Sequence, residues 1–230
     1  MIEISNLSKH FYIGEKRIDV LRELNLSIKK DKITVILGRS GCGKTTLLRL
    51  VAGLESISQG EIKFKEQAKI GFVFQEPRLM PFLNVYENIV FPLKKHEIEA
   101  EKIDSLISMI GLNDFKFAAV SQLSGGMSSR VSLARVLAYE ANLILMDEPF
   151  AALDAFTRAS MQAEILKIQA GKTILFVTHN IDEALFLADE IILLEKGGIK
   201  SNYELSNLAR PRDLLSEELI VIKCKILSEI

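Results

Sequence analysis

The chain has 230 residues and a formal net charge of −1, so it can bury a large core without an acidic or basic excess. Its 48% hydrophobic and 26% charged residues are typical of globular proteins and exclude a disordered chain. Acidic and basic residues are interleaved along the chain, and no basic tract points to nucleic acid. Two cysteines are too few for a disulfide framework and indicate a reducing compartment.

Hydropathy excludes a membrane-spanning protein, because no apolar run reaches the length needed to cross a bilayer. The N-terminus begins MIEISNLSKHF and lacks the apolar centre of a signal peptide. We therefore expect a cytosolic chain, with any membrane role peripheral and through a partner.

Residues 1–30 alternate between apolar and polar side chains, which predicts two antiparallel strands. Phe11 and Tyr12 stand just before the loop at residues 13–17. An aromatic ring at this place either stacks on a nucleotide base or fills the core at a strand end.

The stretch GRSGCGKT at residues 38–45 has the spacing of a phosphate-binding loop. A strand-like run at residues 33–37 precedes it, and a helix-like run to about Ala52 follows it. In such a loop the glycines bring backbone N–H groups close to phosphate, Lys44 reaches the β- and γ-phosphates, and the Thr45 hydroxyl binds Mg²⁺. The alternative is a glycine-rich turn without a ligand.

Cys42 lies inside this loop, at the start of the expected helix. The helix dipole tends to lower the pKa of a thiol there, so we expect alkylation that ATP blocks. The alternative is an inert residue at a permissive loop position.

Gln75 follows a buried strand predicted at residues 70–74, at the end where α/β sheets bind ligands. Its amide can bind a metal, a water or a phosphate, or the residue can simply begin a turn before Pro77.

Residues 76–92 are more apolar than a loop requires, so they form a partner surface or cover the chain's own core. A helix is expected at residues 97–110.

Ser124, Gly125 and Gly126 stand at the start of the next predicted helix, where Ser124 is a suitable N-cap. A hydroxyl and two glycines at a helix N-terminus favour a second anion site, although SGG also occurs in linker turns.

The apolar strand at residues 142–147 ends in Asp147 and Glu148, two acids that the core does not accommodate. One can hold the water shell of Mg²⁺ while the other acts as a base.

Asp154 is expected to cap a helix that ends near Ala170. His179 follows the strand at residues 173–178 and is a candidate γ-phosphate contact if the strands run parallel. Beyond it we expect a helix at 181–188, a strand at 190–195 with a hairpin turn at 197–198, and an amphipathic helix at 212–230.

These motifs occur together in one known family. GRSGCGKT, Gln75, LSGGM, LILMDEP, ALD and the histidine of VTH stand in the order found in ABC-transporter ATPase subunits, and the resemblance covers nearly the whole chain. It implies an α/β fold: a RecA-like P-loop NTPase core with an antiparallel β subdomain and an α-helical subdomain. The chain would then be a single ABC ATPase domain at 1–230, with its core at about 1–91 and 138–230 and its helical subdomain at about 92–137.

The resemblance also implies roles for single residues. Glu148 would be the catalytic base, with His179 and Lys44 as the other catalytic residues. Thr45, Gln75 and Asp147 would hold Mg²⁺. The residues implied to bind ATP are Phe11 or Tyr12, Gly38, Arg39, Ser40, Gly41, Cys42, Gly43, Lys44, Thr45, Thr46, Gln75, Ser124, Gly125, Gly126 and Asp154.

The family implies a head-to-tail homodimer with ATP at the interface, in which Ser124, Gly125 and Gly126 bind the ATP held by the other copy. It also implies integral membrane permease subunits, a separate solute-binding protein, no nucleic acid, and a peripheral place on the cytoplasmic face of the cell membrane. The chain looks like the importers for nitrate, sulfonate and taurine. Met127 stands where a glutamine is commonest at the end of the signature, a variant that fits these importers. Ser129 stands where a glutamine usually precedes the arginine, which puts a contact of that helix in doubt.

Other functions remain to be weighed against an importer ATPase. A soluble ABC-type ATPase acting on nucleic acid or ribosomes lacks the support of a second phosphate loop, a long coiled coil or a basic patch. A binding module without hydrolysis is disfavoured because Lys44, Asp147, Glu148 and His179 are all present. An exporter ATPase is a further alternative.

Overall fold

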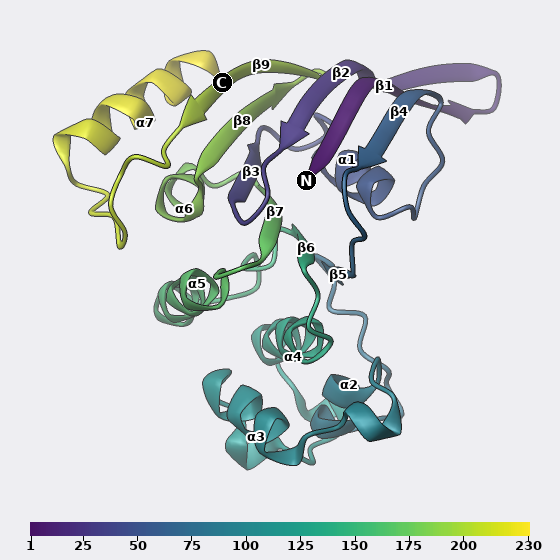
Figure 1. Cartoon of the computed structure of the whole chain (residues 1–230), viewed down its shortest axis with the longest axis vertical. Coiled ribbons are helices and arrows are strands. Elements are labelled where there is room, and N and C mark those ends of the chain that lie inside the picture. The colour runs from purple at the N-terminus through teal and green to yellow at the C-terminus, as the bar shows by residue number, and fades with distance from the viewer. The chain divides into compact units, whose positions relative to one another are not determined.

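The computed structural model describes residues 1–230, whose helices and strands form two compact units (Figure 1). The first unit comprises Met1–Ala68 and Gln169–Ile230, and the second comprises Lys69–Ile168. The domain boundaries expected above, including a helical subdomain at about 92–137, stay predictions. The structure contains no helix whose length and apolar character would let it cross a membrane.

An antiparallel sheet in the first unit confirms the expectation for residues 1–30. Its strand order is β2-β1-β4, with β1 at Ile2–Ile13, β2 at Lys16–Ile28 and β4 at Gln59–Phe64. Ile2, Ile4 and Leu7 are buried and none of the residues between them is, as expected for a sheet with one face on a core.

The first unit also contains parallel strands that set the position of the phosphate loop. β3 (Ile33–Leu37) pairs in parallel with β7 (Thr173–Thr178) on one side and β8 (Glu190–Glu195) on the other. β9 (Gly198–Glu204) then pairs antiparallel with β8 through the expected hairpin. Every residue of β3 and β7 is buried, which is typical of strands covered on both faces.

Three helices complete the first unit: α1 (Lys44–Val51), α6 (Ile181–Leu187) and α7 (Glu217–Glu229). The last helix begins five residues later than predicted. Arg212, the first residue of the predicted helix, lies before α7 and is buried. Its buried guanidinium donates to the carbonyl oxygens of Leu185, Ala188 and Leu205. Burial lowers the pKa of Arg212 to about 10, so the side chain stays protonated at neutral pH.

The second unit contains a parallel strand pair, β5 (Ile70–Val73) and β6 (Leu143–Asp147), and a set of helices. The helices are α2 (Val85–Val90), α3 (Ala100–Met109), α4 (Gly125–Ala138) and α5 (Ala155–Ile168). Short 3₁₀ turns η1, η2 and η3 occur at Lys95–Glu97, Asn113–Phe115 and Val120–Gln122. The helix predicted at 97–110 therefore begins three residues later.

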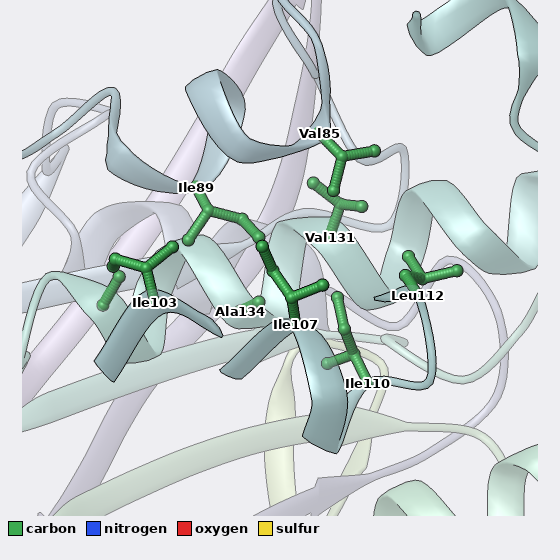
Figure 2. Packing of buried hydrophobic residues seen from close by; sticks show 9 residues of the cluster. Val85, Ile89, Ile103, Ile107, Ile110, Leu112, Val131 and Ala134 are labelled. Atoms are coloured by element: carbon green, nitrogen blue, oxygen red, sulfur yellow. The ribbon is translucent and has the colours of Figure 1, made fainter. Parts of the chain in front are cut away.

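Helices α2, α3 and α4 share one hydrophobic cluster, whose side chains point toward one another in Figure 2. Its buried members are Val85, Ile89, Ile103, Ile107, Ile110, Leu112, Val131, Ala134 and Ala138. The cluster answers part of the question about residues 76–92, since Val85 and Ile89 belong to the chain's own core. Phe82 and Phe91 of the same stretch are exposed.

Candidate nucleotide-binding site

The phosphate loop of the first unit joins the end of β3 to the start of α1, as the sequence predicts. Gly43 caps α1 with a φ of 108°, in the region that favours glycine. A Cβ atom at this position would lie 2.7 Å from a methyl carbon of Leu21 and 2.9 Å from the carbonyl oxygen of Val20. Arg39, Ser40 and Gly41 are exposed, so the loop is open to a ligand.

Lys44 is buried although it carries a charge, and its ammonium lies over its own loop. Nζ donates to the carbonyl oxygen of Gly38 at 2.8 Å and to that of Arg39 at 3.0 Å. Two carbonyl acceptors hold the ammonium while keeping its third N–H available for a phosphate oxygen. Thr45 and Thr46 follow in the first turn of α1 and are half-buried.

Cys42 corrects one expectation. It is half-buried, and this burial raises the pKa of its thiol above the ordinary value, although the charge of Lys44 and backbone hydrogen bonds act in the opposite direction. The helix N-terminus was expected to lower the pKa, but desolvation of the thiolate outweighs it. Beside Cys42 lies a pocket of about 270 Å³, lined by residues 38–42 and 193–196 together with Glu229 and Ile230.

His179 stands at the same edge of the sheet as the phosphate loop. Leu37 and Thr178 are paired in register at the ends of β3 and β7, so Gly38 and His179 follow neighbouring positions. The histidine is exposed. The parallel arrangement on which its expected role depended is therefore present.

Phe11 and Tyr12 lie near the tip of the β1–β2 hairpin and are 37% and 64% exposed. Neither ring fills the core, so that alternative is excluded. The ammonium of Lys9 lies 4.6 Å from the centre of the Phe11 ring, and Tyr12 meets His10 edge to face with ring centres 5.4 Å apart. Both rings remain candidates for stacking on a base.

In the second unit, Gln75, Asp147 and Glu148 gather at one edge of the β5–β6 pair. Val73 and Met146 are partners in the parallel register. Asp147 and Glu148 are the next two residues after Met146, and Gln75 is the second residue after Val73. Asp147 is buried, whereas Gln75 is exposed. Glu148 has a φ of 45°, a left-handed conformation that is uncommon for a glutamate and is concentrated at functional sites.

Ser124 begins α4 as predicted, and its hydroxyl oxygen accepts a hydrogen bond from the backbone N–H of Met127 at 3.2 Å. The linker-turn alternative is excluded because Gly125 and Gly126 form the first turn of the helix. A Cβ atom on Gly126 would lie 3.3 Å from the carbonyl oxygen of Ala152, so the helix start packs closely against the segment before Asp154.

Ser129 makes a local contact where a glutamine was expected. It is buried, and its hydroxyl donates to the carbonyl oxygen of Gly125 at 3.1 Å, one turn earlier in α4. Arg130 donates to the carbonyl oxygen of Ile110 at 2.6 Å, just beyond the end of α3. The departures from the usual signature thus leave the start of α4 hydrogen-bonded within the second unit.

Asp154 caps the next helix, as the sequence predicts. Its Oδ1 accepts from the backbone N–H groups of Phe156 and Thr157, both at 3.0 Å, and its Oδ2 accepts from the Thr157 hydroxyl at 2.6 Å. The hydrogen bond from the Thr157 hydroxyl, followed by the one from its backbone N–H, lowers the pKa of Asp154 below its ordinary value. The carboxylate is therefore ionised at neutral pH.

The candidate metal ligands are chemically suited to Mg²⁺. Thr45, Gln75 and Asp147 offer hydroxyl, amide and carboxylate oxygens, the donor types that this hard cation prefers. The structure has no group of three or more His, Cys, Asp or Glu side chains that could hold a metal.

Comparison with known proteins finds a matching family and similar proteins for this chain. Residues 21–151 match the family described as ABC transporter. The chain is 39% identical over 239 residues to the aliphatic sulfonates import ATP-binding protein SsuB of Bacillus cereus, which covers 99% of this chain and 95% of the relative. It is 41% identical over 219 residues to the taurine import ATP-binding protein TauB of Roseobacter denitrificans, covering 89% and 82%.

A solved structure is similar as well. The ATP-binding cassette MJ0796, a dimer bound to ADP and Pi in a post-hydrolysis state, matches with a TM-score of 0.83 and 32% sequence identity. The match covers 89% of this chain and 99% of that one. This likeness confirms the RecA-like P-loop core predicted from the sequence.

Proposed function

The chain belongs to the ABC transporter family, and we propose that it is the ATP-hydrolysing subunit of a membrane importer that works as a head-to-tail dimer. The observation that carries the proposal is the phosphate loop, with Lys44 held over it by the carbonyl oxygens of Gly38 and Arg39. Such a loop binds the phosphates of a nucleotide through its backbone N–H groups, the start of its helix and its lysine.

Each residue at the phosphates has a role that its chemistry supports. Residues 38–46 hold the triphosphate, and the ammonium of Lys44 contacts the β- and γ-phosphates. Thr45, Asp147 and Gln75 would hold Mg²⁺ through their hydroxyl, carboxylate and amide oxygens. When bound, Mg²⁺ neutralises negative charge on the phosphates.

Glu148 acts as the general base in this proposal. Its carboxylate accepts a proton from the attacking water, whose oxygen bonds to the γ-phosphorus in line with the leaving group. The bond from that phosphorus to the β–γ bridging oxygen breaks, and ADP and inorganic phosphate are the products. His179 contacts the γ-phosphate and keeps it in line for this step.

A second copy completes the site. Ser124, Gly125 and Gly126 at the start of α4 bind the γ-phosphate of ATP held by the partner, and Asp154 lies beside this contact. Phe11 or Tyr12 stacks on the adenine base. One copy then holds only half of each site, so hydrolysis requires two copies to close around the nucleotide.

The importer role includes partners that the relatives' names suggest. We propose integral membrane permease subunits, a separate solute-binding protein, and a peripheral place for this chain on the cytoplasmic face of the membrane. The solute would be a small sulfonate, taurine or a related anion such as nitrate. The exposed Phe82 and Phe91 lie in the segment proposed to meet the permease.

Reconstitution tests this proposal. The chain, co-expressed with its proposed permease partner, is expected to co-purify with that permease and to drive ATP-dependent uptake of labelled taurine or an alkanesulfonate into vesicles. The Glu148→Gln variant is the matched control, since it should assemble without uptake. Absence of ATP hydrolysis would contradict the ATPase role. Hydrolysis by a chain that never associates with the permease would contradict the importer role alone.

A further inference from the structure

We propose that Thr178, Asn180 and Glu183 form a hydrogen-bonded clamp that fixes the backbone on both sides of His179, and that Thr178 and Glu183 are positioning residues for ATP hydrolysis. The clamp lies entirely within the first unit, between the end of β7 and the first turn of α6. The inference rests on the proposed function, in which His179 contacts the γ-phosphate.

Thr178 is the centre of the clamp, because its hydroxyl both donates and accepts. It donates to Oε2 of Glu183 at 2.7 Å and accepts from the backbone N–H of Asn180 at 3.0 Å. Thr178 is 2% exposed and Glu183 is 6% exposed. Hydrogen bonds in such a buried environment are stronger than in water. Removing one partner leaves the other polar group buried without a hydrogen bond, which lowers stability.

Asn180 continues the clamp on the other side of the histidine. Its side-chain oxygen accepts from the backbone N–H of Asp182 at 2.9 Å and from that of Glu183 at 3.3 Å, which caps α6. The residue before His179 and the residue after it are therefore both held by hydrogen bonds, while the histidine itself is exposed.

The C-terminal end of α6, the helix that carries Glu183, is also held by hydrogen bonds. The guanidinium of Arg212 donates to the carbonyl oxygens of Leu185 and Ala188, at 2.9 and 2.7 Å, at the C-terminal end of the helix. On its outer face, Lys223 of α7 pairs with Asp182 at 2.5 Å. The helix that carries Glu183 is thus contacted near both of its ends.

This arrangement holds the backbone of His179 in one position before a phosphate binds. A small misplacement of a group that orients the reacting atoms costs far more rate than affinity, because the remaining contacts still hold the substrate. The phosphate loop is built by β3 and α1, which supply binding without the clamp. Loss of the clamp should therefore lower kcat and leave the KM for ATP nearly unchanged.

The test compares Thr178→Val with Thr178→Ser in the full chain. Valine keeps the shape and removes the hydroxyl, whereas serine keeps the hydroxyl. We expect Thr178→Val to lower kcat by about tenfold or more, with KM within about twofold of the wild type. Thr178→Ser should keep kcat within about threefold, while circular dichroism confirms that both variants are folded.

Two results would overturn the clamp: a folded Thr178→Val variant with wild-type kcat, or a Thr178→Ser variant as impaired as Thr178→Val. If Thr178→Val does not fold, variants of Asn180, the partly exposed N-cap of α6, test the clamp instead. Asn180→Ala should lower kcat in the same way and Asn180→Asp, which keeps an acceptor oxygen, should not. Equal kcat in both cap variants would refute the clamp. A wild-type chain without ATPase activity would overturn the proposed function itself.

Discussion

The ammonium of Lys44 donates a hydrogen bond to the carbonyl oxygen of Gly38, 2.8 Å away, at the other end of the phosphate loop. This hydrogen bond joins the first helical residue to the first residue of the loop. A charge held in this way needs little rearrangement when a phosphate arrives, which is the physical meaning of a preorganised site.

Replacing Lys44 by alanine should weaken ATP binding itself. The substitution removes the cation that faces the phosphates and the hydrogen bonds to Gly38 and Arg39. We expect the dissociation constant for ATP to rise by at least about tenfold in equilibrium titration. Lys63→Ala, which removes an exposed lysine paired with Glu61, is the matched control. Equal affinity in the wild type and Lys44→Ala would show that this loop does not bind the phosphates.

Two substitutions of Ser124 separate helix capping from phosphate binding. Alanine removes the acceptor for the Met127 N–H and should cost about 1 kcal/mol of unfolding free energy, together with ATPase activity. Aspartate keeps a capping oxygen but places a negative charge where the partner's phosphate is expected. Ser124→Asp should therefore retain stability in urea unfolding and lose hydrolysis. Full ATPase activity in Ser124→Asp would contradict the second anion site.

Alkylation of the two cysteines tests whether nucleotide covers Cys42. Cys224 is exposed and serves as an internal control, whereas Cys42 is half-buried. Because burial raises the pKa of Cys42, its thiolate fraction at neutral pH is below that of an ordinary thiol, and its labelling should keep rising with pH into the alkaline range. Mass spectrometry should show that ATP protects Cys42 and not Cys224. Equal labelling of Cys42 with and without ATP would refute its burial under the nucleotide.

The cluster in Figure 2 should determine the stability of the second unit. Ile107 of α3 is buried in the cluster that α2, α3 and α4 share, so Ile107→Ala removes apolar contacts and leaves a cavity. We expect a loss of about 2–5 kcal/mol in unfolding free energy. Val221→Ala, on an exposed face of α7, should change stability by less than about 0.5 kcal/mol. Similar unfolding midpoints for the two variants would contradict the assigned core.

Three strands that precede candidate site residues were predictable because they are almost entirely apolar. β3, β6 and β7 read as buried parallel strands, and the chemically active residues follow their carboxyl ends. Helix α2 was missed because it spans only six residues within a proline-rich stretch. Its signal was present, since Asn84 and Glu87 form a capping box.

Other features depend on burial that periodicity does not report. The pKa of Cys42 is set by desolvation, which opposes the helix dipole that the sequence makes visible. The clamp around His179 was missed, although a threonine before the histidine and a glutamate four residues after it are visible in the sequence. Its meaning appears only when Thr178 and Glu183 are seen to be buried together.

The most direct test of the account is the Glu148→Gln variant with saturating ATP and Mg²⁺. An amide cannot accept the proton of the attacking water, so ATP should bind and remain unhydrolysed between two copies. We predict no phosphate release and a dimer in light scattering, whereas the wild type turns ATP over and returns to monomer. Undiminished hydrolysis, or a variant that stays strictly monomeric with ATP bound, would contradict the claim that two copies enclose the nucleotide and that Glu148 is the base.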